Sequence, residues 1–195
     1  MPTVLTHAAV PVALAAGLGS RIVPPRLLLA GVVASVLPDL DVVAFHLGIA
    51  YAAPLGHRGI SHSLAFAALL AVIAALLARS LRSTRLAAAV FAGACAASHG
   101  LLDMCTNGGL GVALWWPFSE QRVFSAWRVI EVSPLSLQRI LGARGLAVMQ
   151  SELLWVWLPA LASGLLVHTL RRQGARFLVA RTPPLGPGAA SDAQR

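Results

Sequence analysis

The chain has little charge for its length, which bounds the kind of protein it can be. Asp, Glu, Lys and Arg make up 11% of its 195 residues, whereas a soluble domain carries about 25%. Hydrophobic residues make up 57%, and the mean hydropathy is +0.76. This composition argues against an ordinary soluble domain and predicts one compact integral membrane domain.

Cysteine is scarce and lysine is absent. Cys95 and Cys105 fall in one predicted helix, about 15 Å apart along its axis, which is too far for a disulfide. Neither belongs to a paired Cys motif, so the sequence argues against a Cys-rich zinc site. All 15 basic residues are Arg, and the net charge is +8. They lie mostly in short loops and a tail, where they set membrane topology, and we expect no nucleic-acid partner.

Five apolar segments predict an all-α integral membrane bundle of about five spans. A spanning helix needs about 20 residues, and the last three segments reach this length with their flanks. The first two are short, and we expect the second to end at Pro38, because helical geometry is disfavoured just before proline. The segments are 4–18, 27–37, 64–78, 86–102 and 146–170.

The ends of the chain and one long loop complete the expected organisation. No Lys or Arg precedes the first apolar segment, so the basic n-region of a secretory signal is missing and we expect this segment to remain as the first membrane helix. Residues 106–144 form a long outer-side segment whose tryptophans suit an interfacial belt. We expect a membrane domain over 1–172 and a disordered, Arg-, Pro- and Gly-rich cytoplasmic tail over 173–195.

Arginines fall in alternate loops of this arrangement. The positive-inside rule assigns such loops to the cytoplasm. The same threading puts the start of the first helix, the end of the second, the start of the third and the end of the fourth on the opposite face. The loop arginines are Arg21, Arg26, Arg79, Arg82 and Arg85, with Arg171, Arg172, Arg176 and Arg181 after the fifth segment.

Those four helix ends carry seven ionisable side chains, so we expect one site that faces away from the cytoplasm. Ionisable groups at membrane depth are costly and usually face an interior site. Four His and three Asp are also the ligand set expected of a hydrolytic metal centre, with zinc favoured before manganese and one or two ions bound. The predicted metal ligands are His7, Asp39, Asp41, His57, His62, His99 and Asp103.

Each motif taken alone has a simpler reading. His99 and Asp103 share a helix face and are either two ligands or a helix-end His capped by an Asp, with even odds. Asp39 and Asp41 repel each other unless a cation compensates, but in isolation a capped turn after Pro38 explains them better.

The string 57–63, His-Arg-Gly-Ile-Ser-His-Ser, is the most specific of these motifs. Imidazole suits zinc, and the guanidinium of Arg58 suits a phosphate or carboxylate group. The alternative is an interfacial loop in which Arg58 meets lipid phosphate and Ser61 caps the next helix.

These strings together resemble the LexA-regulated, membrane-bound family of metal-dependent hydrolases, often described as bacterial inner-membrane proteins. The family usually shows Thr where this chain has Ser61, which keeps the hydroxyl group. It often shows Thr-Pro-x-Gly where this chain has Cys-Thr-Asn-Gly-Gly at 105–109, which changes the turn. The resemblance implies metal-dependent hydrolysis at the inner membrane. It rests on His7, Pro38-Asp39-Leu40-Asp41, the 57–63 string, Ser98-His99-Gly100-Leu101-Leu102-Asp103 and Trp116-Pro117.

We therefore expect a membrane-bound metal-dependent hydrolase. Arg58 would bind an anionic part of the substrate, and Asp39 or Asp103 would act as general base. A phosphoester, another small molecule or a lipid-linked compound fits a site at the interface, and membrane lipids are the expected partners. The rival hypotheses are a metal carrier, in which the same ligands form a transit site, and a structural membrane protein with capped helix ends.

Overall fold

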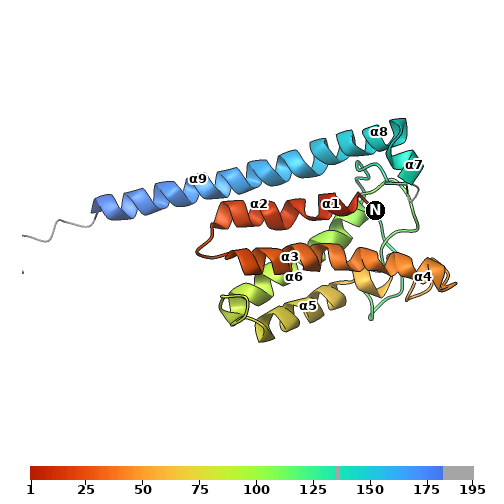
Figure 1. The fold of residues 1–195 in the computed structure, drawn as a ribbon, viewed down its shortest axis with the longest axis horizontal. Helices are drawn as coiled ribbons and strands as arrows, with labels where there is room; N and C mark the ends of the chain where they lie inside the picture. The colour runs from red at the N-terminus through yellow and green to blue at the C-terminus, as the bar shows by residue number, and fades with distance from the viewer. Residues whose placement is uncertain (135–136, 182–195) are drawn as a thin grey trace, which may run out of the picture.

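The computed structural model describes residues 1–134 and 137–181, and within these ranges the chain is a helical bundle without a β-strand (Figure 1). The all-α membrane bundle expected from the sequence is confirmed. The described α-helices are α1 (Val4–His7), α2 (Ala9–Leu18), α3 (Pro25–Val36), α4 (Val43–His46), α5 (Leu64–Leu76), α6 (Arg85–Met104), α7 (Leu137–Ile140), α8 (Ala143–Glu152) and α9 (Leu158–Arg181); 3-10 turns η1 (Leu37–Val42) and η2 (Ile60–His62) and a π-helical turn η3 (Leu153–Trp157) connect some of them.

Three helical segments are long and apolar enough to cross a membrane, and two shorter apolar helices accompany them. The long ones are Pro25–His46, Arg85–Met104 and Ala143–Gly174; the shorter ones are Val4–Leu18 and Leu64–Leu76. The expectation that the second apolar segment ends at Pro38 is wrong. Pro38 stands in the first turn of η1, where its missing N–H costs nothing, so the helical path continues through α4.

The third apolar segment is shorter than expected. Helix α5 has 13 residues, because Ser63 begins it as an N-cap and a turn follows its last residue. The Ser63 hydroxyl accepts a hydrogen bond from the Phe66 amide at 3.1 Å, which confirms a capping hydroxyl in this string but assigns it to Ser63 rather than Ser61. Helix α9 reaches Arg181 and so includes 173–181 of the predicted disordered tail, whereas 182–195 lie outside the described residues.

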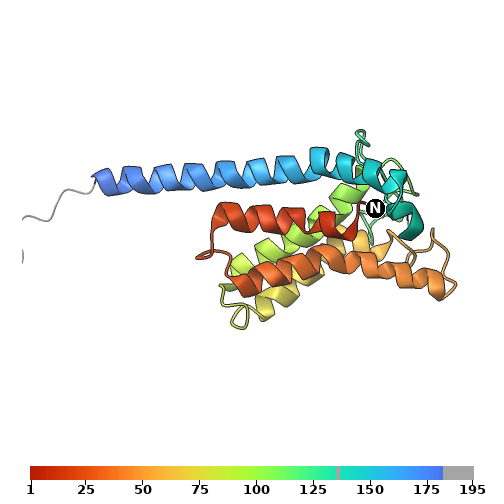
Figure 2. The same ribbon diagram turned by 45° about the horizontal axis from the view of Figure 1, so that its top comes forward.

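Helix α6 runs through the bundle between α3 and α5, and α9 lies along α2 on the other side (Figures 1 and 2). Small residues let these helices approach closely. A Cβ atom on Gly31 would lie 2.3 Å from Cε1 of Phe91, and one on Gly164 would lie 2.6 Å from the carbonyl oxygen of Ala13. Packing through small side chains therefore fixes the positions of α3 against α6 and of α9 against α2.

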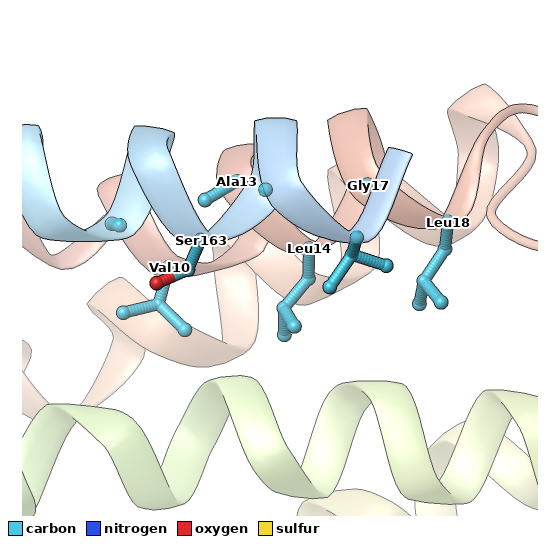
Figure 3. A pocket seen from close by; sticks show the side chains of 9 residues that line it. Val10, Ala13, Leu14, Gly17, Leu18 and Ser163 are labelled. Atoms are coloured by element: carbon cyan, nitrogen blue, oxygen red, sulfur yellow. The ribbon is translucent and has the colours of Figure 1, made fainter. Parts of the chain in front are cut away.

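The two ends of the bundle differ in composition. At one end, which we call the basic end, the turns between α2 and α3 and between α5 and α6 carry Arg21, Arg79 and Arg82 (Figure 1). The interior there is apolar, and an apolar pocket of about 240 Å³ lies beside α2 and α9, with the side chains of Leu14 and Leu18 pointing into it (Figure 3).

The opposite end, which we call the site end, holds the start of α1, η1, η2 and the end of α6. The segment that follows α6 packs onto this end, and Val112, Leu114 and Ile130 are buried there. Phe118 and Trp127 of the same segment are exposed, as an interfacial aromatic belt requires. The four helix ends singled out by the sequence therefore lie together.

Candidate metal centre

Five of the predicted ligands form one buried cluster at the site end, which we call the central cluster. Each side chain is 5% exposed or less. Helix α1 supplies the first, η1 the second, η2 the third and α6 the last two, so four separate segments contribute. The members are His7, Asp39, His62, His99 and Asp103.

Two carboxylates bridge the imidazoles of the central cluster. The Asp39 oxygens lie 3.7 Å from Nε2 of His7 and 3.5 Å from Nε2 of His99. The Asp103 oxygens lie 3.7 Å from Nε2 of His7 and 3.3 Å from Nε2 of His62. The rings of His7 and His99 stack with their centroids 3.7 Å apart. Nitrogen and oxygen donors from all four segments thus converge on a small volume.

The hydrogen bonds of His62 and His99 direct their Nε2 atoms toward each other. Nδ1 of His99 lies 2.7 Å from the carbonyl oxygen of Ser35, which can only accept, so Nδ1 carries the hydrogen and Nε2 the lone pair of the neutral ring. Nδ1 of His62 lies 3.2 Å from Asp41 and 3.0 Å from the Ser61 hydroxyl, whose own hydrogen goes to Asp41, so this Nδ1 also carries the hydrogen of the neutral ring. The two Nε2 atoms are 2.9 Å apart. A shared proton or a cation is needed to reconcile these lone pairs.

The central cluster also contains buried polar atoms without partners. Within the described residues, both ring nitrogens of His7 and both oxygens of Asp39 and of Asp103 are buried and make no hydrogen bond. Buried polar groups are almost always hydrogen-bonded, and unpaired buried charges are strongly unfavourable. A divalent ion held by imidazole nitrogens and carboxylate oxygens would satisfy these atoms, and zinc accepts this ligand set. The residues present therefore fit a metal ion.

Asp41 and His57 lie beside the central cluster rather than within it. Asp41 accepts from Nδ1 of His57 at 2.5 Å, from the Ser61 hydroxyl at 2.6 Å and from the Arg58 amide at 3.0 Å. Together with His62 these two residues could hold an ion, and their role as direct ligands stays a prediction. The contacts of Asp41 favour the role of an outer carboxylate that orients the His62 ring.

Arg58 is fully buried, and its guanidinium has partners inside the protein. Nε lies 2.9 Å from Asp103, Nη1 donates to the carbonyl oxygen of Gly108 at 2.9 Å, and Nη2 donates to the Thr106 hydroxyl at 3.0 Å. Gly109 has a φ of 88°, which favours glycine, and a Cβ atom on it would lie 2.8 Å from Nη1. The predicted contact of Arg58 with an anionic substrate remains untested, and these contacts favour the positioning of Asp103.

Two charged residues that the sequence analysis did not single out hold parts of the site. Arg122 donates to the carbonyl oxygens of His57 at 2.8 Å and Tyr51 at 2.9 Å, which fixes the loop before η2. Glu152 is buried beside α1 and bonds to Thr6. No spacing rule links Arg122 to its partners, but Glu152 was detectable as the only acidic residue of the fifth apolar segment.

The electrostatics of the loop residues follow from burial and from the neighbouring carboxylates. Burial lowers the pKa of His62, but the nearby carboxylates of Asp103 and Asp41 more than offset this, so the pKa of His62 lies above the ordinary value. For the Tyr51 hydroxyl, whose charged form is an anion, burial raises the pKa. The carboxylates around His62 therefore favour a positive charge at its position.

Comparison with protein families matches residues 1–175 to the family described as YdjM inner membrane protein. Among curated proteins, the chain is similar to the inner membrane protein YbcI of Escherichia coli (strain K12), with 46% identity over 162 residues that cover 83% of this chain and 94% of the relative. No solved structure matches the chain. These findings confirm the expected inner-membrane location.

Proposed function

The chain belongs to the YdjM inner membrane protein family, and from this premise we propose that it is a membrane-bound metal-dependent hydrolase. The observation that carries the proposal is the central cluster, in which the oxygens of Asp39 and Asp103 are buried without hydrogen-bond partners and face three imidazoles. Arg58 compensates Asp103, but two buried carboxylates that share one arginine keep an excess of negative charge, which would destabilise the bundle. A bound divalent cation compensates it.

The central cluster would hold one or two ions, zinc first and manganese second, through His7, Asp39, His62, His99 and Asp103. A bound ion of this type supplies Lewis acidity and a water molecule of lowered pKa. The protein contributes fixed ligand orientations, because the Ser35 carbonyl and the Asp41 carboxylate hold Nδ1 of His99 and His62. Outer partners of this kind usually raise metal affinity.

Asp39 is the better placed of the two candidate general bases. Arg58 lies 2.9 Å from Asp103, so this carboxylate is already engaged by a buried guanidinium. Among the described ion pairs Asp39 faces only imidazoles, so its carboxylate is the one left to orient a nucleophilic water, as a general base must.

The position of the site suggests a substrate at the membrane interface. The central cluster lies at the end of the bundle opposite Arg21, Arg79 and Arg82 (Figure 1), and the positive-inside rule puts those arginines in the cytoplasm. The site would then face away from the cytoplasm. Small phosphoesters and lipid-linked phosphoesters are the substrate classes that such a site can reach.

Metal analysis together with hydrolysis assays tests this proposal. We expect detergent-purified protein loaded with zinc or manganese to retain one or two ions per chain and to hydrolyse a nitrophenyl phosphate monoester, a diester or phospholipid vesicles. His62→Ala should lose metal and activity together, because its imidazole donates a lone pair. The matched control is His46→Ala, since His46 is exposed on α4 and should keep both.

Wild-type protein that retains no metal after loading would overturn the proposal. A folded His62→Ala variant with undiminished metal content would remove His62 from the ligands and favour a structural role for the 57–63 string.

The alternative is a non-enzymatic metal carrier, and the apolar basic end argues against it. A transit path needs polar groups along its whole length, but the buried residues of that end include Leu27, Phe91 and Cys95. Protein in vesicles that contain a metal-sensitive dye distinguishes the two functions. An enzyme should give no metal uptake above that of empty vesicles, whereas uptake that His62→Ala abolishes would establish a carrier.

A further inference from the structure

We infer that Glu152 is a positioning residue that holds His7 in the metal centre through Thr6. The inference rests on the proposed function, since it assumes that the central cluster binds a metal ion. No metal-ligand motif in the sequence includes Glu152, and it lies on a different helix from every member of the central cluster.

Glu152 is a buried carboxylate on the helix that is otherwise most exposed. Only 11% of the apolar window in Ala143–Gly174 is buried inside the protein, yet Glu152 is 3% exposed. Three donors satisfy it: the amide of Thr3 at 2.5 Å, the hydroxyl of Thr3 at 2.6 Å and the hydroxyl of Thr6 at 2.7 Å. Three such bonds satisfy a carboxylate that is buried away from water. Glu152 thus ties the start of α1 to α8.

The π-helical turn after Glu152 adds a second contact to the same threonine. Side chains five residues apart on an α-helix point about 140° away from each other. The π turn Leu153–Trp157 takes more residues per turn, which brings Trp157 toward the face of Glu152. The indole N–H of Trp157 donates to the Thr6 hydroxyl at 3.0 Å, while that hydroxyl donates to Glu152. The Thr6 hydroxyl is therefore held from both sides.

His7 needs this support because its ring has no outer partner of its own. His99 is oriented by the carbonyl of Ser35 and His62 by Asp41, whereas neither nitrogen of His7 makes a hydrogen bond to the described residues. Helix α1 has four residues, and so short a helix is unstable without tertiary contacts. Glu152 bonds to Thr3 and to Thr6, the residue directly before His7. It therefore positions His7 through the backbone of α1, in place of a hydrogen bond to the His7 ring.

Metal affinity in a double-mutant cycle tests the inference. Cobalt(II) is titrated to millimolar concentration into detergent-purified protein, and its absorption bands report both the affinity and the ligand geometry. We expect Glu152→Gln to weaken binding by about tenfold to hundredfold, as loss of an outer partner typically does, and to shift the bands. In a His7→Ala background, Glu152→Gln should cause less than about a threefold further loss, because the two changes act through one ligand.

The same fold loss in both backgrounds would overturn the inference and make Glu152 a purely structural residue. The matched control is Glu131→Gln, which breaks the exposed ion pair with Arg144 and should leave cobalt affinity and bands unchanged. Wild-type protein that binds no cobalt, zinc or manganese would refute the proposed function itself, whereas wild-type binding that Glu152→Gln leaves intact refutes the positioning role alone.

A pair of substitutions at Thr6 gives an independent test in case Glu152→Gln does not fold. Thr6→Ser keeps the hydroxyl between Glu152 and Trp157 and should keep the affinity within about threefold. Thr6→Val has a similar shape without the hydroxyl and should reproduce the loss expected for Glu152→Gln. Equal cobalt affinity in the two folded Thr6 variants would contradict a path through this hydroxyl.

Discussion

The site end and the basic end of the bundle bury opposite kinds of side chain. The site end buries charge, with Arg58, His99 and Asp103 fully enclosed. The basic end buries Leu27, Phe91 and small apolar side chains and leaves its arginines in the connecting turns. Apolar packing stabilises a fold directly, whereas buried ion pairs contribute little net stability. The basic end therefore supports the fold, whereas the buried charge of the site end is what a bound metal ion, as proposed, would require.

The hydrogen bonds of the two ends make the same point. At the site end Asp41 alone accepts from His57, Arg58 and Ser61. At the basic end, Arg26 donates to the carbonyl oxygen of Ser80, a surface contact between the first turn of α3 and the turn after α5. Polar networks that are fully satisfied fix one arrangement of side chains, which a ligand site requires and a connecting turn does not.

The largest expected effect on stability comes from breaking the buried ion pair at the site end. Arg58→Ala leaves Asp103 buried without its cation, and we expect the free energy of unfolding to fall by about 3–5 kcal/mol. Arg58→Lys should lower the free energy of unfolding by less than Arg58→Ala does, because lysine keeps the charge but cannot make the forked contacts to Thr106 and Gly108. Unfolding of metal-free protein in mixed micelles measures both variants.

The same variants separate the two roles of Arg58. The 57–63 string predicts that Arg58 contacts an anionic substrate, whereas its contacts in the structure favour the positioning of Asp103. Arg58→Ala protein with wild-type stability and metal content but weakened turnover of an anionic substrate would favour substrate binding.

A smaller effect is expected from crowding the apolar basic end. Gly31→Ala puts a methyl group 2.3 Å from the ring of Phe91, and overpacking of this kind costs about 1–3 kcal/mol. Because the substitution lies away from the central cluster, metal content should stay at the wild-type level. Gly174→Ala on α9 is the control, since its Cβ would meet nothing within 4 Å. If Gly31→Ala lowered metal affinity at unchanged stability, the separation between the two ends would be wrong.

The sequence predicts the broad arrangement because hydrophobic length and Arg placement act at the level of whole segments. Apolar runs locate the helices, and the arginines orient alternate turns, so the meeting of His7, Asp39, His62 and His99 follows. The continuation past Pro38 was missed, because the effect of a proline depends on the local turn, and a 3-10 turn that begins there has no need of its N–H.

Partners in the second layer around the site were harder to predict for a different reason. His99 is oriented by the backbone carbonyl of Ser35. Every residue type has a backbone carbonyl, so the sequence cannot show which residue would provide this contact. Glu152 bonds to Thr6, 146 positions away, and only the fold brings them together. The residue types of the 57–63 string indicate its donors, but they do not show that Arg58 faces inward to Asp103.

Two cysteine substitutions at exposed positions, which should leave stability and metal content unchanged, determine which end of the bundle faces the cytoplasm. Phe118 is 93% exposed in the segment that follows α6, and Ser80 is exposed in the turn at the basic end. In a background with Cys95→Ala and Cys105→Ala, Phe118→Cys should react with an impermeant thiol reagent applied to intact spheroplasts. Ser80→Cys should react only after the membrane is opened, because arginine-rich turns remain in the cytoplasm. The reverse pattern would place the central cluster on the cytoplasmic side, where its substrate would be a cytoplasmic compound or a lipid of the inner leaflet.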